Sequence, residues 1–128
     1  MKKILVFGNP DLEMDSLPLR ILPKLKKEFP DIDFEVRDPN EELFDGDVYT
    51  GVITIVDTVL GIKDIEVFDN LEKFASAPNV SMHDFDALAN LRFLQKLGKI
   101  DRVEIIGVPP GMNKKEAIKK ISALLLKK

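Results

Sequence analysis

The sequence predicts an α/β protein with three αβα layers, in which helices cover both faces of a mostly parallel, twisted sheet. Short apolar runs alternate along the chain with stretches of helical periodicity, which is the pattern of strand–helix–strand units. The run 51–57 (GVITIVD) is β-branched almost throughout and lacks polar alternation, as expected of a central strand buried on both faces. The length of 128 residues fits one domain, spanning 1–128.

Four further strands are expected around this central one. They are predicted at 2–7, 32–37, 64–68 and 101–108. The first is followed by Gly8-Asn9-Pro10 and the last by Pro109-Pro110-Gly111, both of which are strong turn signals.

The first helix is predicted at 17–28. Ser16 stands where an N-cap residue is expected, and Pro18 is tolerated in the first turn. Pro23 lies inside the span, where a proline removes one backbone hydrogen bond and favours a break.

Two more helices are predicted in the second half of the chain. The first, at 84–97, has leucines at three-residue spacing and ends at Gly98. The second begins at Asn113, and Glu116 three residues later completes an Asn version of the capping box. The apolar stripe of this last helix consists of Ile118, Ile121, Leu124 and Leu125.

Charge and residue usage exclude several functional classes. Lys and Arg total 19 against 22 Asp and Glu, a net charge of −3, so no nucleic-acid partner is expected. Without cysteine, the chain has no thiol nucleophile, iron–sulfur centre or Cys-ligated zinc. A single glycine, Gly8, follows the first strand without a G-x-G-x-x-G pattern, so no organic cofactor is expected.

The apolar runs are also too short for a membrane segment. None approaches the roughly 20 residues that a spanning helix needs. The apolar stretch after Met1-Lys2-Lys3 ends at Phe7, which is too short for a signal peptide. We therefore expect a cytoplasmic protein without membrane insertion.

Polar residues interrupt the pattern at three places that a parallel sheet brings to one edge. Asp15 follows the first strand, Asp57 ends the central strand, and His83 precedes the helix at 84–97. Ligands of open α/β sheets bind beyond the carboxyl ends of the strands. Two carboxylates and one imidazole form a mixed oxygen and nitrogen set suited to a divalent transition metal. Three protein ligands would leave positions open for water or a substrate group.

Each of the three residues also has an ordinary structural interpretation. An acid at the end of a strand, such as Asp57, is often a turn former or a helix cap, and Asp15 is equally suited to capping the next helix. A lone histidine, as at His83, is more often a surface or capping residue than a ligand. Sequence spacing does not separate these interpretations, because the fold alone brings the loops together.

These motifs resemble those of the nickel–iron hydrogenase maturation endopeptidases, which trim the C-terminal tail of a hydrogenase large subunit. The shared features are Gly8-Asn9 after the first strand, Asp15 as the second acid of a pair, and Asp57 at the end of the central strand. His83, followed by a leucine within five residues, and the strand end Ile106–Pro109 are similar as well. The resemblance covers most of the chain, with the motifs in the family's order.

The resemblance implies an aspartyl-type endopeptidase whose partner and substrate is a large-subunit precursor already carrying nickel. Asp15, Asp57 and His83 would contact this nickel, which is transient and arrives with the substrate. Asp15 and Asp57 would be the catalytic residues, and Asn9 would contact the substrate. One hypothesis is that the metal or a carboxylate activates water for direct attack, with Asp15 contributing beyond metal contact. A monomeric protein is expected.

The chain departs from the family pattern beside the first proposed ligand. Met14 stands in place of the first acid, and Ser16 and Pro18 replace glycines that usually follow. These differences favour an alternative, a catalytically silent protein of the same fold that binds a metal or the metal-loaded precursor. A third interpretation is an α/β domain that uses the same edge for a different small ligand. Cleavage of a precursor separates the first two, and a response to divalent metals tests the third.

Overall fold

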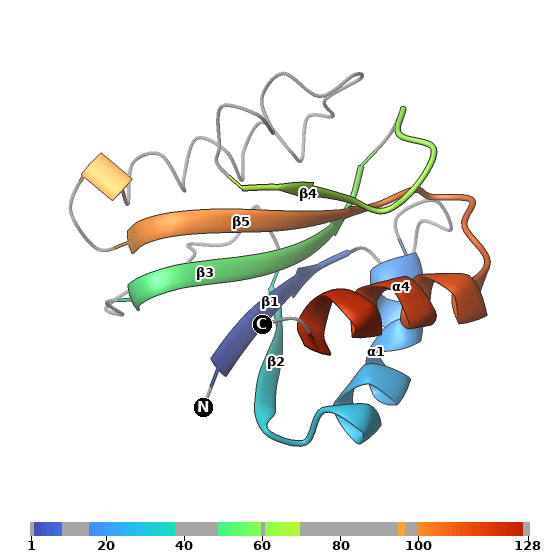
Figure 1. Ribbon diagram of the computed structural model, residues 1–128, viewed down its shortest axis with the longest axis horizontal. Coiled ribbons are helices and arrows are strands. Elements are labelled where there is room, and N and C mark those ends of the chain that lie inside the picture. The colour runs from blue at the N-terminus through green and yellow to red at the C-terminus, as the bar shows by residue number, and fades with distance from the viewer. Residues whose placement is uncertain are drawn as a thin grey trace.

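The computed structural model describes residues 2–8, 16–37, 49–59, 61–69, 95–96 and 100–126. Their five strands and two helices follow the predicted order along the chain (Figure 1). The elements are β1 (Lys2–Phe7), α1 (Leu17–Glu28), β2 (Ile32–Arg37), β3 (Tyr49–Thr58), β4 (Glu66–Phe68), β5 (Ile100–Val108) and α4 (Lys114–Leu126). The structure thus confirms every predicted element that falls within the described residues, with β3 longer and β4 shorter than expected.

The five strands form one sheet in the order β2-β1-β3-β5-β4. All neighbouring pairs are parallel except β4 with β5, which confirms the prediction of a mostly parallel sheet. The connection 59–65 between β3 and β4 is shorter than the roughly dozen residues that a parallel crossover needs. The chain therefore reverses direction, and β4 pairs with the outer edge of β5.

β3 occupies the centre of the sheet because its side chains are apolar on both faces. It pairs with β1 on one side, where Ile55 lies beside Leu5, and with β5 on the other, where Ile55 lies beside Ile105. Ile55 has no solvent-exposed surface and its neighbour Val56 has 1%. Since successive strand residues point to opposite faces, both faces of the sheet are buried here.

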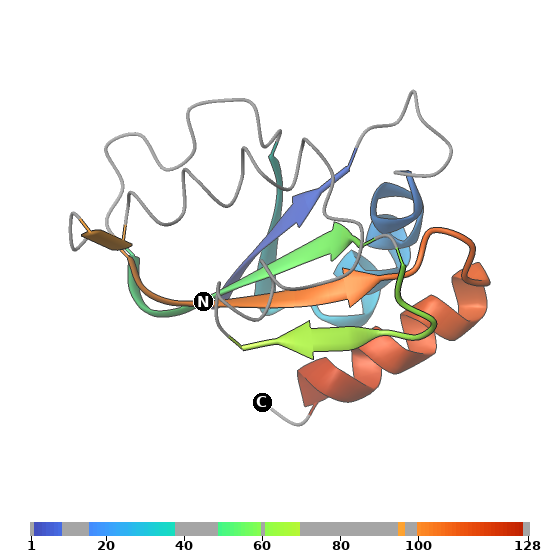
Figure 2. The same cartoon turned by 90° about the horizontal axis from the view of Figure 1, so that it is seen from above.

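One face of the sheet packs against α1 and α4, which lie side by side (Figures 1 and 2). From the sheet this core contains Ile4, Val6, Phe34, Val56, Ile106 and Val108. From the helices it contains Leu17, Ile21, Leu22, Leu25, Ala117, Ile121 and Leu125. The predicted helix at 84–97, which would add a layer, lies outside the described residues apart from the helical Gln95 and Lys96.

The start of α1 differs in one detail from the capping expected of Ser16. Ser16 is the N-cap residue, but its hydroxyl caps no backbone N–H of the helix. Instead, its backbone oxygen accepts hydrogen bonds from the N–H groups of Leu19 and Arg20 at 3.0 Å. Its side-chain oxygen accepts one from Nε of Arg20 at 3.2 Å. Pro18 provides no backbone N–H, so one of the usual donors for a capping side chain is missing.

Pro23 does not break α1, which continues to Glu28. The proline ring lies on the exposed side of the helix. Water can therefore reach the carbonyl of Leu19, which loses its usual intrahelical donor to the proline.

The start of α4 confirms the predicted cap. The side-chain oxygen of Asn113 accepts hydrogen bonds from the backbone N–H of Lys115 at 2.9 Å and of Glu116 at 3.4 Å. Ile121 and Leu125 are buried as predicted, together with Ala117, which the prediction omitted. Ile118 and Leu124 are partly buried against the same core.

Replacing Ile121 by alanine tests how far packing of α4 supports the fold. Ile121 has no exposed surface, so Ile121→Ala should lower the free energy of unfolding by about 2–5 kcal/mol. Leu126→Ala, in the same helix but with Leu126 77% exposed, should change it by less than about 0.5 kcal/mol. Urea denaturation of both variants provides the comparison. Equal effects would show that α4 contributes little to the core.

Candidate functional site

Asp57 lies near the carboxyl end of β3 and is only 7% exposed. Its register partner on β5 is Gly107. Alternation along β3 puts Asp57 on the same face as Ile55, opposite the face that packs against α1 and α4. The structure therefore confirms the expected position of Asp57, a carboxylate at the end of the central strand, where open α/β sheets bind their ligands.

Gly107 leaves space for an apolar group beside Asp57. A Cβ atom at Gly107 would lie 2.9 Å from Cγ2 of Val59, 3.0 Å from Cε2 of Phe68 and 3.3 Å from Cδ1 of Ile62. These distances are shorter than ordinary carbon contacts, so a larger residue would displace the three side chains. Gly107 therefore allows the chain after β3 and the edge strand β4 to pack tightly over the end of β5, next to Asp57.

The other predicted site residues, Asn9, Asp15 and His83, lie outside the described residues. Ser16, which follows Asp15 in the sequence, begins α1, and α1 contacts both β1 and β3. Within the described ranges, no group of three His, Cys, Asp or Glu residues is placed to hold a metal ion. The three-ligand set of Asp15, Asp57 and His83 therefore stays a prediction, with Asp57 its described member.

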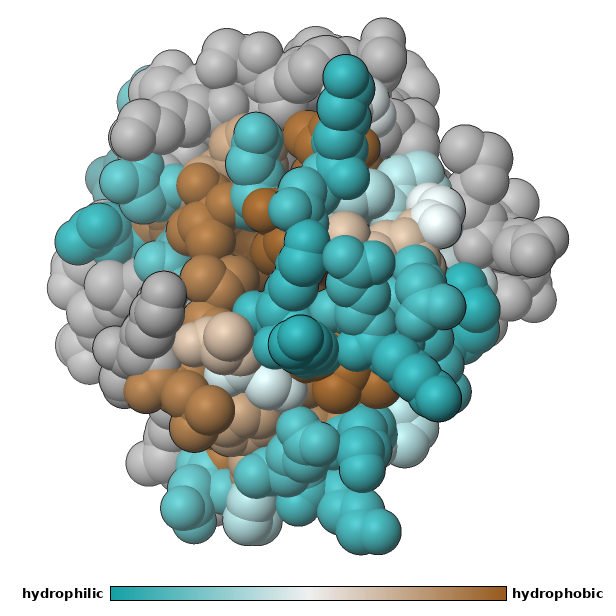
Figure 3. Space-filling model, turned by 45° about the vertical axis from the view of Figure 1, so that its right-hand side comes forward, coloured by the Kyte–Doolittle hydropathy of each residue, from teal (hydrophilic) through white to brown (hydrophobic). Residues whose placement is uncertain are grey.

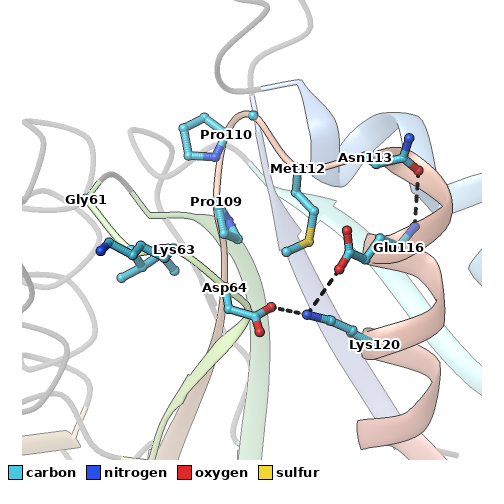
Figure 4. Close-up of a pocket in the computed structure, with 11 residues that line it drawn as sticks. Gly61, Lys63, Asp64, Pro109, Pro110, Met112, Asn113, Glu116 and Lys120 are labelled. Atoms are coloured by element: carbon cyan, nitrogen blue, oxygen red, sulfur yellow. Dashed lines mark hydrogen bonds and ion pairs between the residues drawn. The ribbon is translucent and has the colours of Figure 1, made fainter.

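A cleft that the sequence analysis missed lies beyond the end of β5. It has a volume of about 610 Å³ and lies between the turn 61–64, the turn 109–113 and the first turns of α4 (Figure 4). Gly61 adopts the left-handed conformation, with φ of 84°, which glycine tolerates without strain. The sequence marked the turn at Pro109-Pro110-Gly111, but nothing in it indicated that residues 61–64 form a turn facing it.

Three charged side chains form one end of this cleft. Nζ of Lys120 lies 2.5 Å from Oδ1 of Asp64 and 3.3 Å from Oε1 of Glu116. The hydrogen bond from Lys120 lowers the pKa of Asp64, and the backbone N–H of Ile65 lowers it further. In turn, the hydrogen bond to Asp64 raises the pKa of Lys120. We call Asp64, Glu116 and Lys120 the charged triad.

Two solved structures share this fold over almost the whole chain. The hydrogenase maturating endopeptidase HybD from E. coli matches with a TM-score of 0.69 at 16% sequence identity, covering 99% of this chain and 93% of that one. An endopeptidase from Escherichia coli, solved in solution, matches with a TM-score of 0.70 at 19% identity and the same coverage. This chain has the fold of the hydrogenase maturation endopeptidases.

A third match extends this fold to an archaeal protein. The hydrogenase 2 maturation peptidase from a Thaumarchaeota archaeon has a TM-score of 0.54 at 16% identity, covering 98% of this chain and 95% of that one. Searches against protein-family models and against curated protein sequences give no match. The likeness to the hydrogenase maturation endopeptidases is thus visible in the fold, which confirms the expected α/β class.

Across the described segments, no helix is both long enough and apolar enough to cross a bilayer.

Removing the charge of Lys120 tests the electrostatics of the charged triad. In Lys120→Gln, the pKa of Asp64 should rise toward its ordinary value, because the hydrogen bond that lowers it is lost. A lowered pKa favours the folded state above the unfolded pKa, and this contribution disappears as the pH falls through the folded pKa, below about pH 4. Carboxyl ¹³C NMR titration of Asp64 measures the shift, with Lys119→Gln as the matched control. Identical Asp64 titrations in both variants would contradict the pairing.

Proposed function

We propose that this protein is an endopeptidase that removes the C-terminal extension of a nickel-loaded hydrogenase large-subunit precursor. The observation that carries the proposal is Asp57, a buried carboxylate at the end of the central strand of a fold shared with hydrogenase maturation endopeptidases. A fold by itself does not specify an activity, so the argument depends on this residue and its position. The identification of Asp57 as a metal-contacting acid follows from the family resemblance of the sequence.

In this proposal the nickel belongs to the substrate. Asp57, together with Asp15 and His83, would contact the metal and so distinguish a loaded precursor from an empty one. Neighbouring β1 and β5 hold the backbone of β3 on both sides, and burial restricts the carboxylate of Asp57 to few orientations. Such a preorganised ligand needs little rearrangement to bind.

Cleavage then requires an activated water molecule. A carboxylate, for which Asp15 is our candidate, accepts a proton from water while the water oxygen attacks the carbonyl carbon of the scissile peptide bond. The carbon–nitrogen bond breaks as the proton passes to the departing amine. The products are a new C-terminal carboxylate on the large subunit and the released peptide. Asn9 would contact the substrate.

A second candidate function is a catalytically silent protein that binds the metal-loaded precursor. The structure places Ser16 and Pro18 at the start of α1, where the family pattern has glycines. A proline in this first turn restricts the backbone more than glycine does. This difference favours the alternative. Cytoplasmic location and a monomeric state stay predictions under either function.

Intact-mass spectrometry of a nickel-loaded large-subunit precursor tests the proposed cleavage. The wild-type protein should release one discrete C-terminal peptide. Asp57→Asn, which keeps the shape but removes the charge, should slow release at least about 100-fold, as should Asp15→Ala. Asp33→Asn, an exposed acid on β2, is the matched control and should cleave normally.

The other outcomes of this experiment are equally informative. Complex formation without any loss of mass would support the silent binding protein and contradict the protease. Full cleavage by Asp57→Asn would show that Asp57 is not part of the proposed site. Neither cleavage nor complex formation would contradict both candidate functions.

Nickel contact through His83 predicts a pH dependence. An unperturbed imidazole titrates near ~6.5 and only its neutral form binds a metal, so Ni²⁺ binding should weaken below about pH 6. Isothermal titration with Ni²⁺ from about pH 8 to about pH 5 measures this, and His83→Gln should abolish the imidazole-dependent part. Wild-type binding that stays constant over this range would exclude His83 as a ligand.

A further inference from the structure

We propose that the cleft beside the charged triad binds an extended segment of the protein substrate, in which an aliphatic and a basic side chain lie two residues apart. This inference rests on the proposed function, because it makes the cleft a docking site for the same precursor. Its volume of about 610 Å³ lies in the range of sites that bind small ligands or a few side chains of a peptide.

Three apolar residues, Pro109, Pro110 and Met112, lie in the wall formed by the turn 109–113, which ends at the polar Asn113. Pro109 is buried, and Pro110 and Met112 are partly buried. In Figure 4, the side chain of Met112 reaches into the space between α4 and the turn 61–64. Methionine is flexible and polarisable, so it adapts to an aliphatic side chain inserted beside it.

The charged triad at the other end carries a net negative charge. Two carboxylates, of Asp64 and Glu116, share the single ammonium group of Lys120. Their side chains are 59% and 51% exposed, so an incoming cation can reach both. Lys63, which precedes Asp64 in the turn 61–64, points away from the charged triad in Figure 4. A basic side chain is therefore the complementary partner at this end.

The start of α4 is poorly suited to an anionic ligand. Its amides at Lys115 and Glu116 already donate to the side chain of Asn113, and that of Ala117 donates to the Asn113 carbonyl. Few backbone donors are left for a phosphate or carboxylate. Hydrophobic and hydrophilic side chains lie next to each other on the face of the molecule shown in Figure 3.

The cleft lies close to Asp57 along the sheet. Gly107 is the register partner of Asp57, and Pro109 follows it by two residues. Strand spacing and rise place the Cα atom of Pro109 roughly 8 Å from that of Asp57. The side chain of Asp57 lies on the face of the sheet opposite α4, so a peptide that reaches both Asp57 and the cleft has to pass around the carboxyl end of β5. Side chains two residues apart point to the same side, so both can enter the cleft.

Peptide titration by NMR tests this site without cleavage or nickel. The probe is Ac-Gly-Leu-Gly-Lys-Gly-NH₂, compared with peptides in which Leu is replaced by Ser or Lys by Glu. We expect the probe to shift the Met112 methyl signal and the amide signals of Gly61 and Gly111. Each replacement should weaken binding at least about 5-fold, which corresponds to roughly 1 kcal/mol.

Neutralising the carboxylates of Asp64 and Glu116 separates recognition of the peptide's charge from non-specific binding. In the double variant Asp64→Asn/Glu116→Gln, Lys120 loses both of its partners, so the preference for the Lys peptide over the Glu peptide should disappear or reverse. Asp33→Asn, at the far edge of the sheet, should keep the wild-type preference. Thermal unfolding of each variant verifies that the fold is intact. This is expected because exposed ion pairs contribute little to stability.

Three results would overturn the proposal. They are no shifts up to about 5 mM probe, shifts confined to residues away from the cleft, or equal binding of all three peptides by the wild type. The failures of the two proposals are distinguishable. Cleavage of the precursor without peptide binding would refute the docking site in the cleft and leave the proposed protease function standing. Peptide binding without precursor cleavage would refute the protease and leave a peptide-binding site.

Discussion

Burial of β3 on both faces is the constraint on which the rest of this structure depends. A strand with apolar side chains on both sides has to be paired along both edges and covered above and below, since any exposed part loses hydrophobic stabilisation. Here β1 and β5 supply the two edges, and α1 with α4 covers one face. Asp57 is the charged residue of this strand and lies at its buried end, together with the buried hydroxyl-bearing residues Thr54 and Thr58. Burying a charged group is costly unless it has a partner, which makes Asp57 the candidate binding residue of this strand.

Packing around the end of β5 connects the two proposed binding regions. Gly107 lets Val59, Ile62 and Phe68 approach the backbone beside Asp57. Two residues later, the chain turns through Pro109 and Pro110 to form one wall of the cleft. The same short segment therefore shapes the surroundings of the candidate metal-contacting acid and of the cleft. A peptide bound in the cleft would be positioned by α4 and by two turns that continue directly from strands of the sheet.

The charged triad illustrates how exposed charges contribute to recognition more than to stability. Its ion pairs are solvent-exposed, and such pairs usually contribute little to the free energy of unfolding. Nevertheless, they connect the turn after β3 to α4, across an interval of 56 residues, and leave a net negative charge at one end of the cleft. Complementary charge of this kind improves the choice and the orientation of a partner.

The sequence alone determined the elements whose signals are local. Three signals depend only on neighbouring residues: the alternation of apolar runs with stretches of helical periodicity, Asn113 as a helix cap, and the β-branched run of β3. The structure agrees with each of them. Tertiary structure decided the antiparallel β4, the continuity of α1 through Pro23, and the face on which Asp57 lies. It also formed the cleft, which joins the turn 61–64 to residues of 109–120. These features depend on which segments pack together, and that choice follows from burial over the whole chain, which no short stretch of sequence encodes.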